Sequence, residues 1–149
     1  MLWRLGCRDN RIVNRAEPSA GLEYKPAGNM AAVVNGGKAV GAWRLYSPGA
    51  PSPEPGDILY FGVVSPSGGI TREHVAVLKS FPPGGAGSLV TYDLGHGVQP
   101  EGSETTRAIS QNGDVAFFGS TRRLVGFDSL ALVPFAADAD LSDHTLANA

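Results

Sequence analysis

Residues 57–64, DILYFGVV, form a dense run of β-branched and aromatic side chains and mark the point where the chain changes character. Two similar runs follow, EHVAVLKS at 73–80 and LVTYD at 89–93, with the turn-forming sequence FPPGGAGS between them. Short runs of this kind, bounded by glycine and proline, are typical of strands. We expect three more strands, at residues 105–110, 114–118 and 122–127. Because the connections are too short for helical crossovers, the sheet should be mostly antiparallel.

The residues before this run carry helical signals. Cys7–Ala16 contains no glycine or proline, which predicts a helix. A second helix is expected at Asn29–Val34, ended by the glycines that follow it. The turn Pro55-Gly56-Asp57 leads into the first strand, and Asp57 is expected to hydrogen-bond the turn backbone. Helices followed by strands predict an α+β fold, with N-terminal helices packed on a sheet of about five to six short strands.

The composition is that of one folded domain with many turns. The chain has 149 residues, enough for one core, and only 17% are charged, which excludes a highly charged disordered chain. Its 20 glycines and 11 prolines follow no period and therefore indicate turns, not collagen. We place a single domain at residues 1–135 and an acidic tail at 136–149. The aspartates of that tail lack the glycine and the final glutamate of a calcium loop.

Charge and hydropathy argue against two classes of partner. The net charge is −2 and no basic stripe is present, so nucleic acid is not an expected partner. No apolar run reaches the roughly 18 residues of a transmembrane helix, and the N-terminal MLWRLGC is too short for a secretory signal. The single cysteine, Cys7, forms no disulfide framework within the chain and is a candidate nucleophile.

Cys7 opens the first expected helix. In that helix it shares a face with the polar residues Asn10 and Asn14, whereas the apolar Ile12 and Val13 point elsewhere. The positive end of the helix dipole stabilises a thiolate at this position, which favours reactivity. The alternative is that Cys7 is a small buried residue of the core.

His74 begins an apolar strand and is the candidate general base, although it could equally be a structural histidine. A third group should hold its imidazole in one tautomer. Asp93 and His96 are both candidates in the sequence YDLGHG, and they would face opposite sides of a strand. We favour Asp93, because a carboxylate stabilises an imidazolium better than a second imidazole does. His96 stays the alternative third residue, and Asp93 could instead cap a turn.

Several short motifs between Gly6 and Leu130 occur together in one known group of enzymes. They are Cys7, Asn14-Arg15, Gly21, Gly28-Asn29, Pro55-Gly56-Asp57-Ile58 and His74-Val75-Ala76-Val77. This combination resembles the CHAP and NlpC-type cysteine peptidases, which have a papain-like fold. The resemblance implies that Cys7 is the nucleophile, His74 the general base and Asp93 the orienting residue. It further implies hydrolysis of an amide bond in the peptide part of peptidoglycan, with no metal and no other cofactor.

The resemblance also implies partners and a place of action. The substrate would be the stem peptides of peptidoglycan. A phage lysin or an exported antibacterial toxin would be made in the bacterial cytoplasm and would act in the periplasm or on the cell wall after non-classical export. An inhibitor or immunity protein would be a second partner of such a toxin.

Three other interpretations stay open. Cys-His-Asp sites also serve deamidases and acyltransferases, and spacing alone does not separate these from hydrolases. A non-catalytic β-rich binding or adaptor domain would need only a buried Cys7 and a structural His74. A metal site could combine Cys7, His74, Asp93 and His96, but the chain has neither a CxxC pair nor an HExxH motif.

Overall fold

The computed structural model describes residues 31–93 and 103–133. These residues fall into two compact units, one formed by Trp43–Leu130 and the other by the described residues outside that range. Each unit is described by itself. Four sequence predictions lie outside the described residues: Cys7, His96, the helix at residues 7–16 and the acidic tail at residues 136–149.

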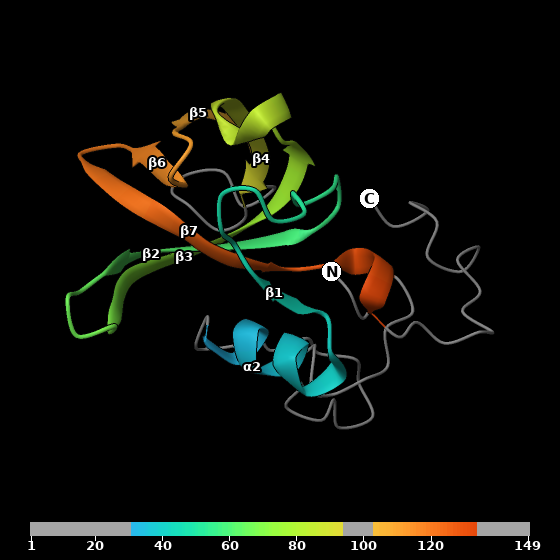
Figure 1. Ribbon diagram of the computed structural model, residues 1–149. Coiled ribbons are helices and arrows are strands. Elements are labelled where there is room, and N and C mark those ends of the chain that lie inside the picture. The colour runs from blue at the N-terminus through green and yellow to red at the C-terminus, as the bar shows by residue number, and fades with distance from the viewer. Residues whose placement is uncertain (1–30, 94–102, 134–149) are drawn as a thin grey trace. The chain divides into compact units, whose positions relative to one another are not determined.

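The unit Trp43–Leu130 consists of strands that pair antiparallel (Figure 1). They are β1 (Trp43–Leu45), β2 (Ile58–Val64), β3 (Ile70–Ser80), β4 (Gly87–Asp93), β5 (Ser103–Ile109), β6 (Asp114–Phe117) and β7 (Ser120–Asp128). Two short 3-10 segments are also present, η1 (Pro83–Gly85) and η2 (Leu130–Leu132). The strand order is β1-β7-β2-β3-β4-β5-β6, and β6 also pairs with β7. Strands β2 to β7 therefore form a closed six-stranded barrel, and β1 is an extra strand on β7.

This barrel shows that the α+β, papain-like prediction is wrong. All six predicted strands are present near their expected positions, but they close on themselves instead of forming an open sheet under helices. The strand β7 makes the closure, because it pairs with both β2 and β6, and it is longer than the predicted segment 122–127. It pairs with β2 from Gly62↔Arg123 to Ile58↔Asp128, and its first residues pair with β6. Closure removes the exposed sheet edges that an open sheet would leave.

The one α-helix among the described residues is α2 (Ala31–Val40), which lies in the other unit. It runs through Asn35, where the sequence predicted its end, because glycines within a helix cost only about 1 kcal/mol each. The helix ends at Gly41, whose φ of +77° is readily adopted only by glycine. Its last turn is closed by Ala42 N, which donates to Gly37 O at 2.9 Å.

The interior of the barrel has an apolar part and a polar part. Alternate residues of each strand point inward, as His74, Ala76 and Leu78 do on β3. The apolar core consists of Leu59, Phe61, Ala76, Leu78, Leu89, Ile109, Val115, Leu124 and Phe127. Each large member contributes roughly 1.5–3 kcal/mol through burial. Toward the end of β4 the inward residues become polar, namely Thr91 and Asp93.

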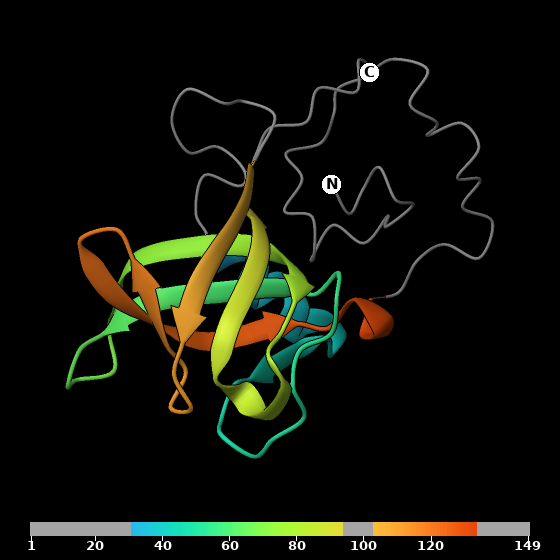
Figure 2. The ribbon, with the colours of Figure 1, turned by 90° about the horizontal axis from the view of Figure 1, so that it is seen from above.

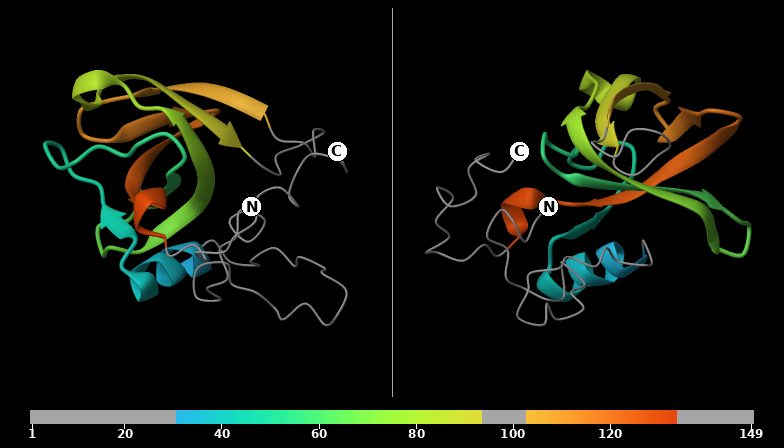
Figure 3. Two further views of the ribbon diagram at one scale, coloured as in Figure 1. Left: turned by 90° about the vertical axis from the view of Figure 1, so that its right-hand side faces the viewer. Right: turned by 180° about the vertical axis from the view of Figure 1, so that it is seen from behind.

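The strands curve strongly around this interior (Figure 3), and β4 and β5 cross the direction of β2, β3 and β7 (Figure 2). A β-bulge accentuates the curvature: Val63 pairs with Thr71 and Phe61 pairs with His74, so Arg72 and Glu73 both lie opposite Gly62. The bulge sets the register in which His74 is buried. The turn before β2 is fixed by Asp57 as expected, since its carboxylate accepts hydrogen bonds from the backbone N–H groups of Glu54 and Leu130, both at 2.8 Å.

Candidate functional site

Two of the predicted catalytic residues lie next to each other in the polar part of the barrel. His74 belongs to β3 and Asp93 ends β4, where Ala76 is its paired residue, so the two side chains are diagonal neighbours on the inner face. His74 Nε2 lies 3.3 Å from Asp93 Oδ1, within ion-pairing distance. Both side chains are almost completely buried. The structure therefore brings together the proposed base and the proposed orienting carboxylate.

Asp93 is held as a carboxylate by its neighbours. Thr91 Oγ1 donates a hydrogen bond to Asp93 Oδ1 at 3.0 Å, and Arg107 donates to both carboxylate oxygens. Burial raises the pKa of the Asp93 carboxyl, but the His74 imidazole, the Arg107 guanidinium and the Thr105 hydroxyl outweigh burial and hold the pKa well below its usual range. Asp93 is therefore negatively charged at neutral pH and can orient the imidazole.

Aromatic rings enclose His74. The Phe61 ring is stacked with its centroid 6.1 Å away, and the Phe117 ring meets the imidazole edge-on at 5.3 Å. The His74 residue as a whole is 1% exposed. Packing and Asp93 together fix the plane of the ring. With Nε2 facing Asp93, the nitrogen that faces away from this carboxylate is Nδ1.

Two arginines of the site were missed in the sequence. Arg107 lies two residues before the buried Ile109 on β5, and Arg122 lies two residues before the buried Leu124 on β7. Their guanidinium carbons lie 4.4 Å and 4.3 Å from the centroid of the Phe117 ring. The period of two along each strand is the signal that could have placed them inside the barrel.

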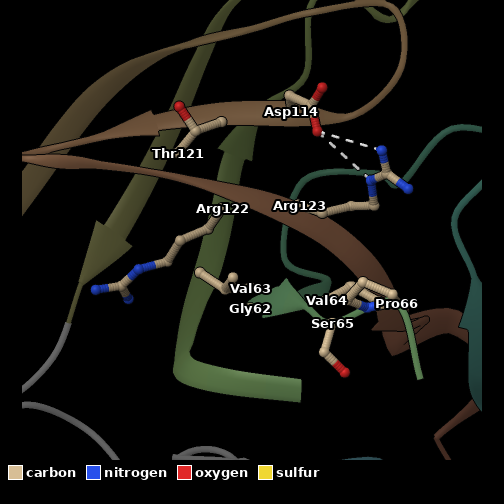
Figure 4. Close-up of a pocket in the computed structure, with 9 residues that line it drawn as sticks. All are labelled: Gly62, Val63, Val64, Ser65, Pro66, Asp114, Thr121, Arg122 and Arg123. Atoms are coloured by element: carbon tan, nitrogen blue, oxygen red, sulfur yellow. Dashed lines mark hydrogen bonds and ion pairs between the residues drawn. The ribbon is translucent and has the colours of Figure 1, made fainter. Parts of the chain in front are cut away.

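A shallow groove of about 390 Å³ lies between the end of β2 and the start of β7. It is lined by Gly62, Val63, Val64, Ser65, Pro66, Asp114, Thr121, Arg122 and Arg123. Figure 4 shows Arg123 turned toward Asp114, with Nε 3.5 Å from Oδ1, while Arg122 extends in the opposite direction. Neither His74 nor Asp93 lines this groove, so it is separate from the buried pair.

Other predictions concern metals, membranes and the remaining site residues. Cys7 and His96 lie outside the described residues, so neither is placed relative to His74. Within residues 31–93 and 103–133, no group of three or more His, Cys, Asp or Glu side chains is arranged to hold a metal ion. In the same part of the chain no helix is long and apolar enough to cross a membrane.

No protein-family model matches the chain, and no curated protein or solved structure shows significant similarity to it. The function is therefore inferred from the residues and from the geometry of the polar site.

Proposed function

We propose that this chain is a cysteine hydrolase that cleaves an amide bond in the peptide part of peptidoglycan. Cys7 is the nucleophile, His74 the general base and Asp93 the residue that orients His74. The observation that carries the proposal is the 3.3 Å contact between His74 Nε2 and Asp93 Oδ1 in a buried polar site. Its second support comes from the sequence alone: Pro55-Gly56-Asp57 and His74-Val75 occur together, as in the CHAP and NlpC-type peptidases, although the barrel does not share their papain-like fold.

In this mechanism His74 Nδ1 takes the proton of the Cys7 thiol, and the thiolate attacks the amide carbonyl. The resulting oxyanion collapses to a thioester, the C–N bond breaks, and the imidazolium gives its proton to the leaving amine. The same imidazole then deprotonates a water molecule, which attacks the thioester and releases a carboxylate and the free thiol.

Asp93 acts through His74 in both halves of the reaction. It stays ionised because its pKa is held well below the usual range, by the His74 imidazole and the Arg107 guanidinium against the opposing effect of burial. Its negative charge stabilises the imidazolium that forms in each half, and the low dielectric of the barrel interior strengthens this attraction.

The test is digestion of soluble peptidoglycan fragments by the full-length chain, with new amines and carboxylates detected by mass spectrometry. The wild-type chain is expected to release products, and Cys7→Ala is expected to release none. Asp93→Asn should lower kcat by about 10²-fold or more, because the imidazolium loses its counter-charge. Lys79→Gln, on the exposed surface, should leave kcat unchanged. Equal product from the wild-type chain and Cys7→Ala across all stem peptides would rule out the peptidase.

The second candidate is a non-catalytic binding or adaptor domain, which one observation favours. His74 is 1% exposed and Arg107 already neutralises Asp93, as in a buried network with a purely structural role. Alkylation of Cys7 by iodoacetamide separates the two candidates. In a hydrolase the reaction proceeds well below pH 8.5, roughly the pKa of a free thiol, and slows in His74→Gln. In a binding domain the reaction follows an ordinary thiol pKa and does not depend on His74.

A further inference from the structure

The polar part of the barrel carries more positive than negative charge. Burial lowers the pKa of Arg122, and the positive charges of Arg107 and of the exposed Arg72 lower it further, so Arg122 lies close enough to each of them to be repelled by it. Among the described residues, the one carboxylate within ion-pairing distance of any of these three arginines is Asp93, which Arg107 binds. The carboxylate of Glu73, the residue next to Arg72, accepts a hydrogen bond from the Tyr60 hydroxyl. Within the described part of the chain, Arg72 and Arg122 thus have no carboxylate as a counter-ion.

Arg122 carries a buried N–H donor that no described residue pairs with. Among the described residues, none makes a hydrogen bond with its buried Nε atom, and no carboxylate lies within ion-pairing distance of its guanidinium. The neighbouring Arg123 differs, since it pairs with Asp114 at 3.5 Å. Buried N–H donors normally make a hydrogen bond, so a buried donor without one at a charged site needs a physical explanation.

Phe117 holds both inner guanidinium groups in place. Its ring lies under Arg107 and Arg122, with the guanidinium carbons 4.4 Å and 4.3 Å from the ring centroid. A cation–π contact with a ring does not use the N–H donors of a guanidinium as a hydrogen bond does, so an oxyanion can still accept from them. The ring therefore orders these side chains without using their donors.

We propose that Arg122, together with Arg72 and Arg107, binds an oxyanion, either a carboxylate or a phosphate. Both groups accept paired hydrogen bonds from a guanidinium fork. Arg72 has a φ of +49°, which is uncommon for a residue other than glycine, and it lies in the bulge opposite Gly62. Backbone of this kind is often found where a fold positions a functional side chain. If the chain is the hydrolase proposed above, the anion is a free carboxylate of its peptide substrate, but the binding itself does not depend on that activity.

The test uses the full-length Cys7→Ala chain, so catalysis has no part in it. Sodium phosphate, sodium acetate and N-acetylalanine are titrated separately, and binding is followed through the arginine Nε–H signals in NMR spectra. Sodium chloride at equal ionic strength and the neutral N-acetylalanine amide are the ligand controls. At least one oxyanion is expected to shift the Arg122 signal at concentrations at which both controls leave it unchanged. The tighter of the carboxylate and phosphate arms identifies the class of ligand.

Arg122→Gln is expected to weaken this binding by about tenfold or more, since it removes a charged hydrogen-bond donor. Its matched control is Arg123→Gln, which should bind within about twofold of the parent because Arg123 is occupied by Asp114. If Arg122→Gln does not fold, Arg122→Lys replaces it in the test. This variant keeps the positive charge but loses the paired N–H donors of the guanidinium, so it should bind the oxyanion more weakly than the parent. The proposal is overturned if no oxyanion exceeds the chloride control, or if the variants at positions 122 and 123 bind alike.

Discussion

Asp93 interacts with four side chains, those of His74, Thr91, Thr105 and Arg107, so its charge should matter for stability as well as for activity. Asp93→Asn leaves the mostly buried Arg107 without a counter-ion and should lower the free energy of unfolding by about 3 kcal/mol. Urea denaturation at pH 7 measures the change. The control is Glu104→Gln, which removes an exposed ion pair with Lys79 and should leave stability nearly unchanged. Equal losses in the two variants would mean that the Arg107–Asp93 pair contributes no more than a surface contact.

Asp128 has the opposite electrostatic environment. It is 1% exposed, and neither oxygen of its carboxylate has a hydrogen-bond partner among residues 31–93 and 103–133. Burial, together with the charge of Asp57, raises the pKa of the Asp128 carboxyl to about 7. In the unfolded chain a carboxyl of this type titrates near 3.9, so the folded chain binds the proton more tightly. The contribution of the Asp128 carboxyl to the free energy of unfolding is therefore greatest below about pH 4 and falls as the pH rises to about 7.

Asp128→Asn should remove this pH dependence, because an amide does not ionise. Relative to the wild-type chain, the free energy of unfolding of the variant should increase by about 2 kcal/mol between pH 5 and pH 8. Urea denaturation at each pH unit measures this. Asp93 does not affect the comparison. Because the pKa of its carboxyl is lowered, its contribution to stability is lost only at a pH below the usual pKa of an aspartate. If the difference in free energy of unfolding between the wild-type chain and the variant stays constant from pH 5 to pH 8, the pKa of Asp128 is not raised.

The sequence suggests the proximity of His74 and Asp93 more directly than it suggests the inward position of the two arginines. His74 begins an apolar run and Asp93 ends one, which indicates burial, and a base with an orienting carboxylate is a recognisable chemical pattern. Arg107 and Arg122 stand among polar residues, and arginine is rarely buried without a partner. The spacing of two residues from the buried Ile109 indicates the face of β5 that Arg107 occupies, but its position next to Asp93 depends on the register of the folded sheet.

At the scale of single strands, Gly126 allows β7 to lie between two neighbours. It pairs with Leu45 of β1 and with Tyr60 of β2. A Cβ atom at this position would lie 2.5 Å from Arg44 O and from Trp43 Cζ2. The carbonyl belongs to the β1 backbone, so the clash cannot be relieved without moving that strand.

Gly126→Ala should therefore lower the free energy of unfolding by about 2 kcal/mol. The control is Gly69→Ala in the hairpin between β2 and β3, where the added Cβ meets only Ser65 Oγ, at 3.2 Å. This hydroxyl belongs to a small exposed side chain, so the control should lose less than about 1 kcal/mol. Thermal denaturation of both variants is the measurement. If the two melting temperatures fall equally, the close approach of β1 to β7 is not a constraint on position 126.

Six strands were predicted near their true positions because their β-branched and aromatic residues are local signals. β1 was not predicted, since three residues, WRL, are too few to show a period. The end of α2 was misplaced because glycines at 36 and 37 indicate a stop, while the stop is made by the positive φ of Gly41. Such a conformation depends on the folded backbone and cannot be identified from the type of residue alone.

For the whole molecule, closure of the barrel is the feature that the sequence did not predict. An open antiparallel sheet and a closed barrel share the same alternation along each strand. They differ in whether the last strand pairs with the first, here β7 with β2, which are far apart in the sequence. The same limit applies to the proposed site, because Cys7 and His74 are separated by most of a domain and no local pattern determines whether they meet.

The closed barrel should fold without the rest of the chain. All nine residues of the apolar core and both closing pairings of β7 lie between Trp43 and Leu130. A fragment of residues 43–130 is therefore expected to unfold cooperatively in urea, with dispersed amide signals in NMR spectra. Leu124→Ala within the fragment should remove about 2–5 kcal/mol, much of the stability of a domain this small.

The same fragment tests the oxyanion site separately from the proposed hydrolase. It lacks Cys7, so it should cleave no peptide, yet it retains Arg72, Arg107 and Arg122 and should bind the oxyanion as the full chain does. Titration with acetate and phosphate, each compared with chloride, measures this. An unfolded fragment would show that the barrel depends on residues outside 43–130. A folded fragment that has lost oxyanion binding would place part of that site elsewhere in the chain.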